Sequence, residues 1–67
     1  MSRLLSSAEI IRVPERNGFT FISKKGSHCK YIKDSFVVII PHPRKEIPSG
    51  TFMSILRQSG LKREDFR

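Results

Sequence analysis

Three short runs of strand-forming residues, separated by two tight turns, most constrain the fold of this chain. The runs are FTFISKK (residues 19–25), HCKYIK (28–33) and FVVII (36–40). Because connections this short favour hairpins, the sequence predicts a three-stranded antiparallel meander. The last run is apolar on both faces, so we expect it in the middle of the sheet or under a partner.

Helix signals precede these runs. Ser6 and Glu9 have the spacing of a capping box, and Gly18 is suited to a left-handed C-terminal cap, so a helix is expected over residues 7–17. Pro14 lies inside this segment. Its ring clashes with the carbonyl group four residues earlier, and we therefore expect a kink or a break there.

A second helix is predicted after the third run. Phe52, Ile55 and Leu56 form one apolar face, and Gly60 can close the helix. Phe66 in the tail is expected to fold back on the core. The α-β-β-β-α order predicts an α+β, two-layer fold with both helices on one face of the sheet, and the other face is then free for a ligand. With 67 residues, we expect a single domain spanning 1–67.

The charge of the chain favours a polyanionic partner. Thirteen Lys and Arg residues against six Asp and Glu residues give a net charge of +7, which leaves RNA, DNA and an acidic protein open as partners. The lone Cys29 excludes an internal disulfide, and no zinc-ligand spacing is present, so neither a metal nor a cofactor is expected. The chain has no membrane-length apolar run and no signal-peptide segment at its start, so we expect the encoded protein to act in the cytoplasm, away from membranes.

The segment KKGSHCKY carries the chemistry. His28 opens the second predicted strand and shares a face with Lys30. RNA supplies its own nucleophile in the 2′-hydroxyl group, so a histidine among lysines can act as general base or acid while the lysines stabilise charge on the phosphate. From the residues alone, a histidine after such a turn is more often a hydrogen-bonding surface residue than a catalytic one. The expected phosphate contacts around it are Lys24, Lys25, Gly26, Ser27 and Lys30.

A second set of candidates lies in the proline-rich stretch 41–50. His42 can be the complementary acid, or it can hydrogen-bond within a loop fixed by its flanking prolines. Arg44 and Lys45 can bind backbone phosphate or pair with Glu46. Tyr31 can stack on a base or pack in the core.

The segment NGFTFISKKGSHCKY (17–31) resembles the signature of the HicA family, in which a helix end is followed by a strand and a K-G-S-H turn. IPHPRKEIPSGTFMSILRQSGLKREDF (40–66) is similar to the family's V-P-H-P loop, its K-E-L-x-x-G-T segment and its following helix. The order and spacing of these pieces match over nearly the whole chain.

This resemblance implies a fold like the double-stranded-RNA-binding domain and activity as an mRNA interferase, a toxin inhibited by a HicB antitoxin. The family's catalytic histidine maps to His28. Two other functions stay open: a non-catalytic RNA-binding module, and a protein-interaction subunit for an acidic partner.

Overall fold

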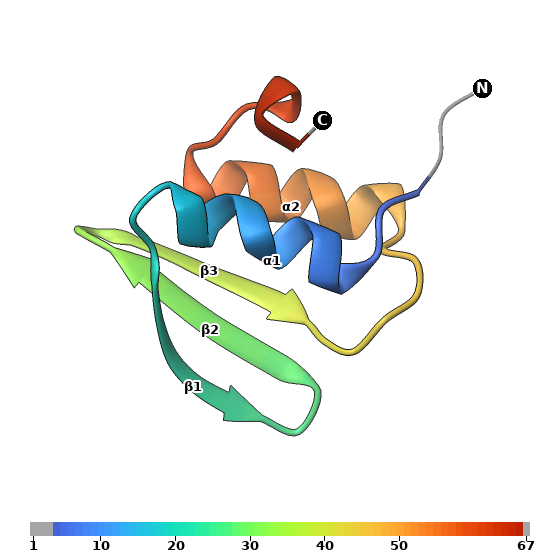
Figure 1. Ribbon diagram of the computed structural model, residues 1–67, viewed down its shortest axis with the longest axis horizontal. Helices are drawn as coiled ribbons and strands as arrows, with labels where there is room; N and C mark the ends of the chain where they lie inside the picture. Colours follow the sequence, from blue (N-terminus) through green and yellow to red (C-terminus); the bar gives the residue numbers. More distant parts are fainter. Residues whose placement is uncertain (1–3, 67) are drawn as a thin grey trace.

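The computed structural model describes residues 4–66 and confirms the predicted α+β architecture (Figure 1). A short 3-10 turn, η1, follows the two helices and three strands. The elements in chain order are α1 (Ser7–Arg16), β1 (Thr20–Lys25), β2 (His28–Lys33), β3 (Phe36–Pro41), α2 (Ser49–Ser59) and η1 (Arg63–Phe66).

Helix α1 begins at the predicted capping box. The backbone N–H of Ser6 donates to Glu9 Oε1 at 2.9 Å, and the N–H of Glu9 donates to Ser6 Oγ at 3.2 Å. The expected break at Pro14 is wrong, because α1 continues to Arg16. Pro14 cannot donate to the Ile10 carbonyl, but its ring is fully buried, and this burial offsets part of the cost.

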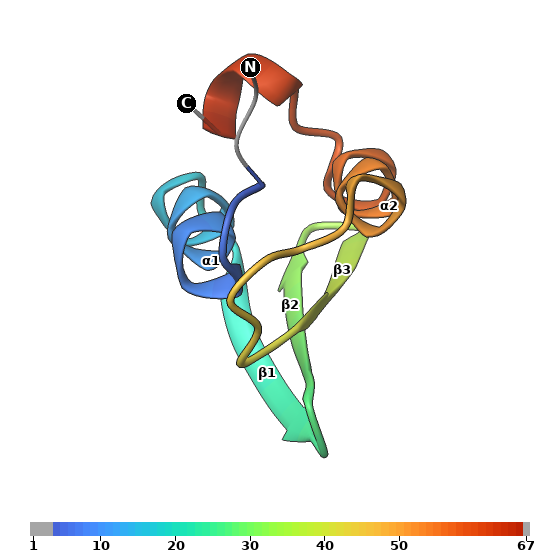
Figure 2. The same cartoon turned by 90° about the vertical axis from the view of Figure 1, so that its right-hand side faces the viewer.

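The three strands form an antiparallel sheet in the order β1-β2-β3, with β2 in the centre. The expectation that the third strand could be central is therefore wrong. Strand β3 lies at an edge, and α2 packs beside it (Figure 2). Gln58 Oε1 of α2 accepts a hydrogen bond from the backbone N–H of Ile39 at 2.9 Å. A helix thus covers the edge that β3 leaves unpaired.

The core lies between the two helices and one face of the sheet. Ile10 and Ile55 bring the helices into contact with this core, and both are fully buried. Phe66 is also buried, as expected for the tail. The sheet residues of the core alternate with outward-facing ones along β2 and β3: Cys29, Tyr31, Val38 and Ile40. The opposite sheet face therefore carries no helix.

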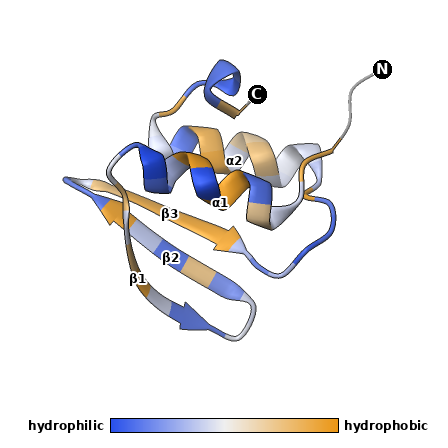
Figure 3. Cartoon of the chain, in the orientation of Figure 1, coloured by the Kyte–Doolittle hydropathy of each residue, from blue (hydrophilic) through white to orange (hydrophobic). Residues whose placement is uncertain are grey.

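Figure 3 shows how polarity divides over the sheet: β3 is largely apolar, whereas β1 and β2 turn polar toward the hairpin that joins them. Gly60 ends α2, which confirms the predicted C-terminal cap, and its φ of 71° makes the cap left-handed. A Cβ atom at Gly60 would lie 2.8 Å from Cε1 of Phe36, so glycine also permits the contact between α2 and β3.

Within residues 4–66, no helix has both the length and the apolarity to cross a membrane.

The burial of Tyr31 makes a prediction about stability at high pH. Burial raises the pKa of its phenol above the usual 10.0, and the negative charges of Glu15 and Cys29 raise it further. Because the folded-state pKa lies above that of the unfolded chain, the stabilising effect is fully present below about pH 10 and is lost as pH rises through the folded-state pKa.

We expect the ultraviolet titration of Tyr31, the chain's one tyrosine, to have a higher midpoint in native protein than in denaturant. The free energy of unfolding should fall more steeply above pH 10 than it does in Tyr31→Phe. Equal midpoints in the two states would contradict the assigned burial.

Candidate functional site

His28 lies at the start of β2, directly after the hairpin turn. Its side chain is exposed on the sheet face that carries no helix, which we call the open face. The alternation along β2 explains this placement. Cys29 and Tyr31 are 3% and 5% exposed and point into the core, so their neighbours His28 and Lys30 must point out. The predicted common face of His28 and Lys30 is confirmed.

A β-bulge in β1 decides which lysine lies beside His28. The register shifts between Phe21 and Ser23, with Phe21 paired to Tyr31 but Ser23 paired to Lys30. Cross-strand partners share a face, so the bulge moves the second half of β1 to the opposite alternation. Lys25 consequently pairs with His28 on the open face.

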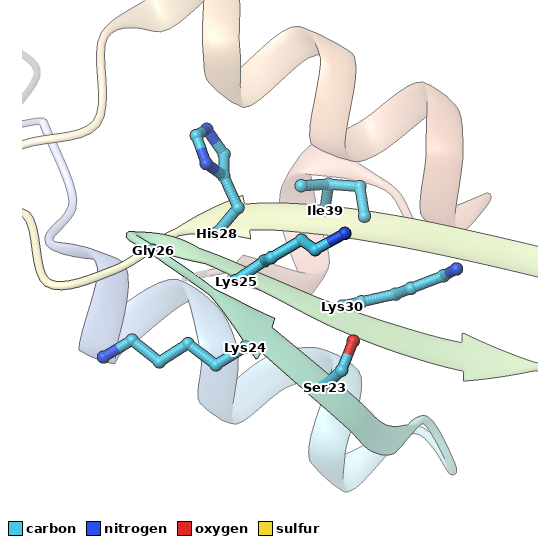
Figure 4. A pocket seen from close by; sticks show the side chains of 7 residues that line it. All are labelled: Ser23, Lys24, Lys25, Gly26, His28, Lys30 and Ile39. Carbon is cyan, nitrogen blue, oxygen red and sulfur yellow. The ribbon is translucent and has the colours of Figure 1, made fainter.

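Lys24 was expected to share the phosphate-binding surface. The structure pairs it with the buried Cys29 instead, so it starts from the helix-facing side of the sheet. In Figure 4 the Lys24 side chain extends away from Lys25, His28 and Lys30. Lys24, Lys25, His28 and Lys30 all contribute to the lining of one pocket. In the same view Lys25 and Lys30 extend in one direction along the sheet, whereas the His28 ring stands up from the start of β2.

This pocket on the open face has a volume of about 610 Å³. Ser23, Lys25, His28, Lys30 and Ile39 from all three strands line it, with no carboxylate among the lining residues. A phosphate group placed here would meet ammonium groups and one imidazole, the combination that can bind the phosphate and also transfer a proton.

The Gly26–Ser27 turn holds the site at one end of the sheet. Gly26 has a φ of 58°, and a Cβ atom at this position would meet no other atom within 4 Å. The turn therefore presents its backbone to solvent. The carbonyl of Ser27 accepts a hydrogen bond from the backbone N–H of His42 at 2.7 Å. The two predicted groups of candidates are thereby joined at this turn.

His42 is half-buried, and its Nδ1 lies 2.6 Å from the hydroxyl oxygen of Ser7. The expected hydrogen bond is therefore present, although its partner belongs to α1 rather than to the loop. Ser7 was missed by sequence reasoning because it lies 35 residues away along the chain and carries no motif of its own. Arg44 and Lys45 are exposed beside this pair.

Tyr31 packs in the core, where its ring makes an edge contact with Phe21 at a centroid distance of 5.6 Å. Of the two interpretations of Tyr31, core packing is confirmed and base stacking is not, because the ring is only 5% exposed. Within residues 4–66, no group of three or more His, Cys, Asp or Glu side chains is placed to hold a metal ion.

The chain resembles a known protein family. A family model described as "HicA toxin of bacterial toxin-antitoxin" matches residues 7–61, which include both helices, the whole sheet and the loop that carries His42. No protein of curated function matches the chain significantly.

Proposed function

Because the chain belongs to the HicA toxin family of bacterial toxin–antitoxin systems, we propose that this toxin is an endoribonuclease, an mRNA interferase, with His28 as its catalytic residue. The observation that supports this most directly is the exposed imidazole on a lysine-bearing sheet face. Since the substrate is mRNA, the cytoplasm is the compartment in which we place the activity.

The proposed reaction uses the nucleophile that RNA carries. The 2′-oxygen forms a bond to phosphorus as the bond from phosphorus to the 5′-oxygen breaks. One proton leaves the 2′-hydroxyl group and one reaches the departing 5′-oxygen. His28 takes one of these two roles, a contribution of roughly 10²- to 10⁴-fold in rate. Lys25 and Lys30 stabilise the charge that develops on the phosphate, and the route calls for neither a metal ion nor a cofactor.

The RNA-binding surface that we propose extends along both sides of the Gly26–Ser27 turn. Lys25 and Lys30 lie on the open face with His28, and Lys24, whose side chain extends away from them, would reach the RNA backbone from the edge of the sheet. The complete proposed set is Lys24, Lys25, Gly26, Ser27, Lys30, His42, Arg44 and Lys45. Most of these contacts go to phosphates, so affinity should depend strongly on salt.

A HicB-like antitoxin is the proposed inhibitor. The open face has no helix over it, and the chain carries a net charge of +7, so an acidic partner would be steered toward it. Covering this face would separate His28 from any phosphodiester.

A non-catalytic RNA-binding module is the second candidate. It is favoured by the composition of the open-face pocket, where His28 is the single imidazole and none of the lining residues is a carboxylate. Such a surface can bind the backbone of an A-form helix without cleaving it.

His28→Ala distinguishes these two functions. We expect the variant to bind RNA like the wild type, because the lysines remain. Its rate of RNA cleavage should fall by about 10²-fold or more, and it should no longer arrest growth. Gel assays of RNA cleavage and fluorescence measurements of RNA binding would be compared. If His28→Ala cleaves RNA as fast as the wild type, His28 is not catalytic. If the wild type itself does not cleave RNA, the second candidate is favoured.

The lysines of the proposed RNA-binding surface should differ in their effect on binding. In the His28→Ala background, Lys25→Gln and Lys30→Gln should each reduce the slope of log affinity against log salt by about 1. Lys24→Gln should change it less, because its side chain points elsewhere, and Lys62→Gln, beyond α2, is the matched control. Equal slopes for Lys25→Gln and Lys62→Gln would exclude the open face as the RNA-binding surface.

A further inference from the structure

A second pocket, of about 460 Å³, lies where the loop after β3 meets the start of α1. His42, Arg44 and Lys45 line it together with Ser7, and no acidic side chain belongs to its lining. The backbone N–H of His42 donates to the Ser27 carbonyl, so this pocket is attached directly to the turn that precedes His28.

Ser7 organises the second pocket. Its side chain is 1% exposed and lies between α1 and the loop. Ser7 Oγ accepts a hydrogen bond from the backbone N–H of Arg44 at 2.8 Å, and the backbone N–H of Ser7 donates to the Arg44 carbonyl at 3.0 Å. One buried serine therefore fixes the backbone of Arg44 in both directions.

The same hydroxyl group holds the His42 ring in place. Ser7 Oγ lies 2.6 Å from His42 Nδ1 and donates to the Arg44 carbonyl oxygen at 3.2 Å. The Nδ1 edge of the imidazole is thereby fixed against α1, and the ring lines the pocket beside the cations of Arg44 and Lys45.

We propose that this second pocket binds the RNA phosphate next to the one that is presented to His28, and that Ser7 is the positioning residue for it. The inference rests on the proposed function for its ligand, a phosphodiester. The cations of Arg44 and Lys45 are groups that bind phosphate oxygens in proteins, and the imidazole of His42 lines the same pocket. With one phosphate held on each side of the Gly26–Ser27 turn, the intervening nucleotide is fixed in register with His28.

Replacing single phosphates along an RNA oligonucleotide by neutral methylphosphonates tests the site without cleavage. In the His28→Ala background, one such replacement next to the cleaved linkage should weaken binding about tenfold, because a charge-assisted contact is lost. Arg44→Gln should abolish the effect of that replacement alone, and Lys62→Gln should preserve it. If Arg44→Gln leaves the penalty unchanged at every linkage, the second phosphate site does not exist.

Ser7→Ala tests the positioning role, with Ser59→Ala as the control because Ser59 is also buried, at 3% exposure. Nitrogen-15 NMR of the histidine rings should show the hydrogen bond at His42 Nδ1 in the wild type and in Ser59→Ala, and its loss in Ser7→Ala. Ser7→Ala should also raise KM for RNA with a smaller change in kcat. An unchanged His42 spectrum and unchanged KM would overturn the role of Ser7.

The outcomes separate this inference from the proposed function. If the wild type binds RNA without cleaving it but shows the Arg44-dependent penalty, the second phosphate site is supported and the proposed nuclease activity is wrong. If the wild type cleaves RNA and shows no such penalty, the nuclease activity is supported and the second phosphate site is wrong. Should Ser7→Ala fail to fold, the methylphosphonate series decides the question alone.

Discussion

The alternation of side chains along β2 is the constraint on which the site depends. Cys29 and Tyr31 must reach the core, and this requirement places His28 and Lys30 on the opposite face. A slip of one residue would bury the imidazole and expose the phenol. The same pairs that stabilise the sheet therefore determine where the proposed catalytic group lies, and the position of His28 is coupled to folding itself.

Two local features refine this arrangement. The bulge between Phe21 and Ser23 reverses the alternation in β1, so that Lys25 rather than Lys24 lies beside His28. The hydrogen bond from His42 to Ser27 then ties the loop after β3 to the same hairpin. Cations from both sides of the sheet are thus collected around one turn, while the core and both helices lie behind it. A chain of this size can dedicate the whole open face to a polyanion, and a single partner on that face would occlude it.

Local signals in the sequence predict most of this fold. The capping box at Ser6, the C-terminal cap at Gly60 and the placement of His28 depend on neighbouring residues, and each is confirmed. Two features that depend on contacts distant in sequence were not predicted. An apolar pattern cannot show that α2 covers the edge of β3, and no motif links Ser7 to His42. The low helix propensity of Pro14 was likewise outweighed by the burial of its ring.

The central claim is that a phosphodiester meets His28 on this face and is cleaved by attack of the neighbouring 2′-hydroxyl group. Analysis of the ends of the RNA products tests it most directly. The account predicts a 2′,3′-cyclic phosphate or a 3′-phosphate on one fragment and a 5′-hydroxyl group on the other, with no cleavage where the 2′-hydroxyl group is replaced by hydrogen. Products with 5′-phosphate and 3′-hydroxyl ends would contradict it.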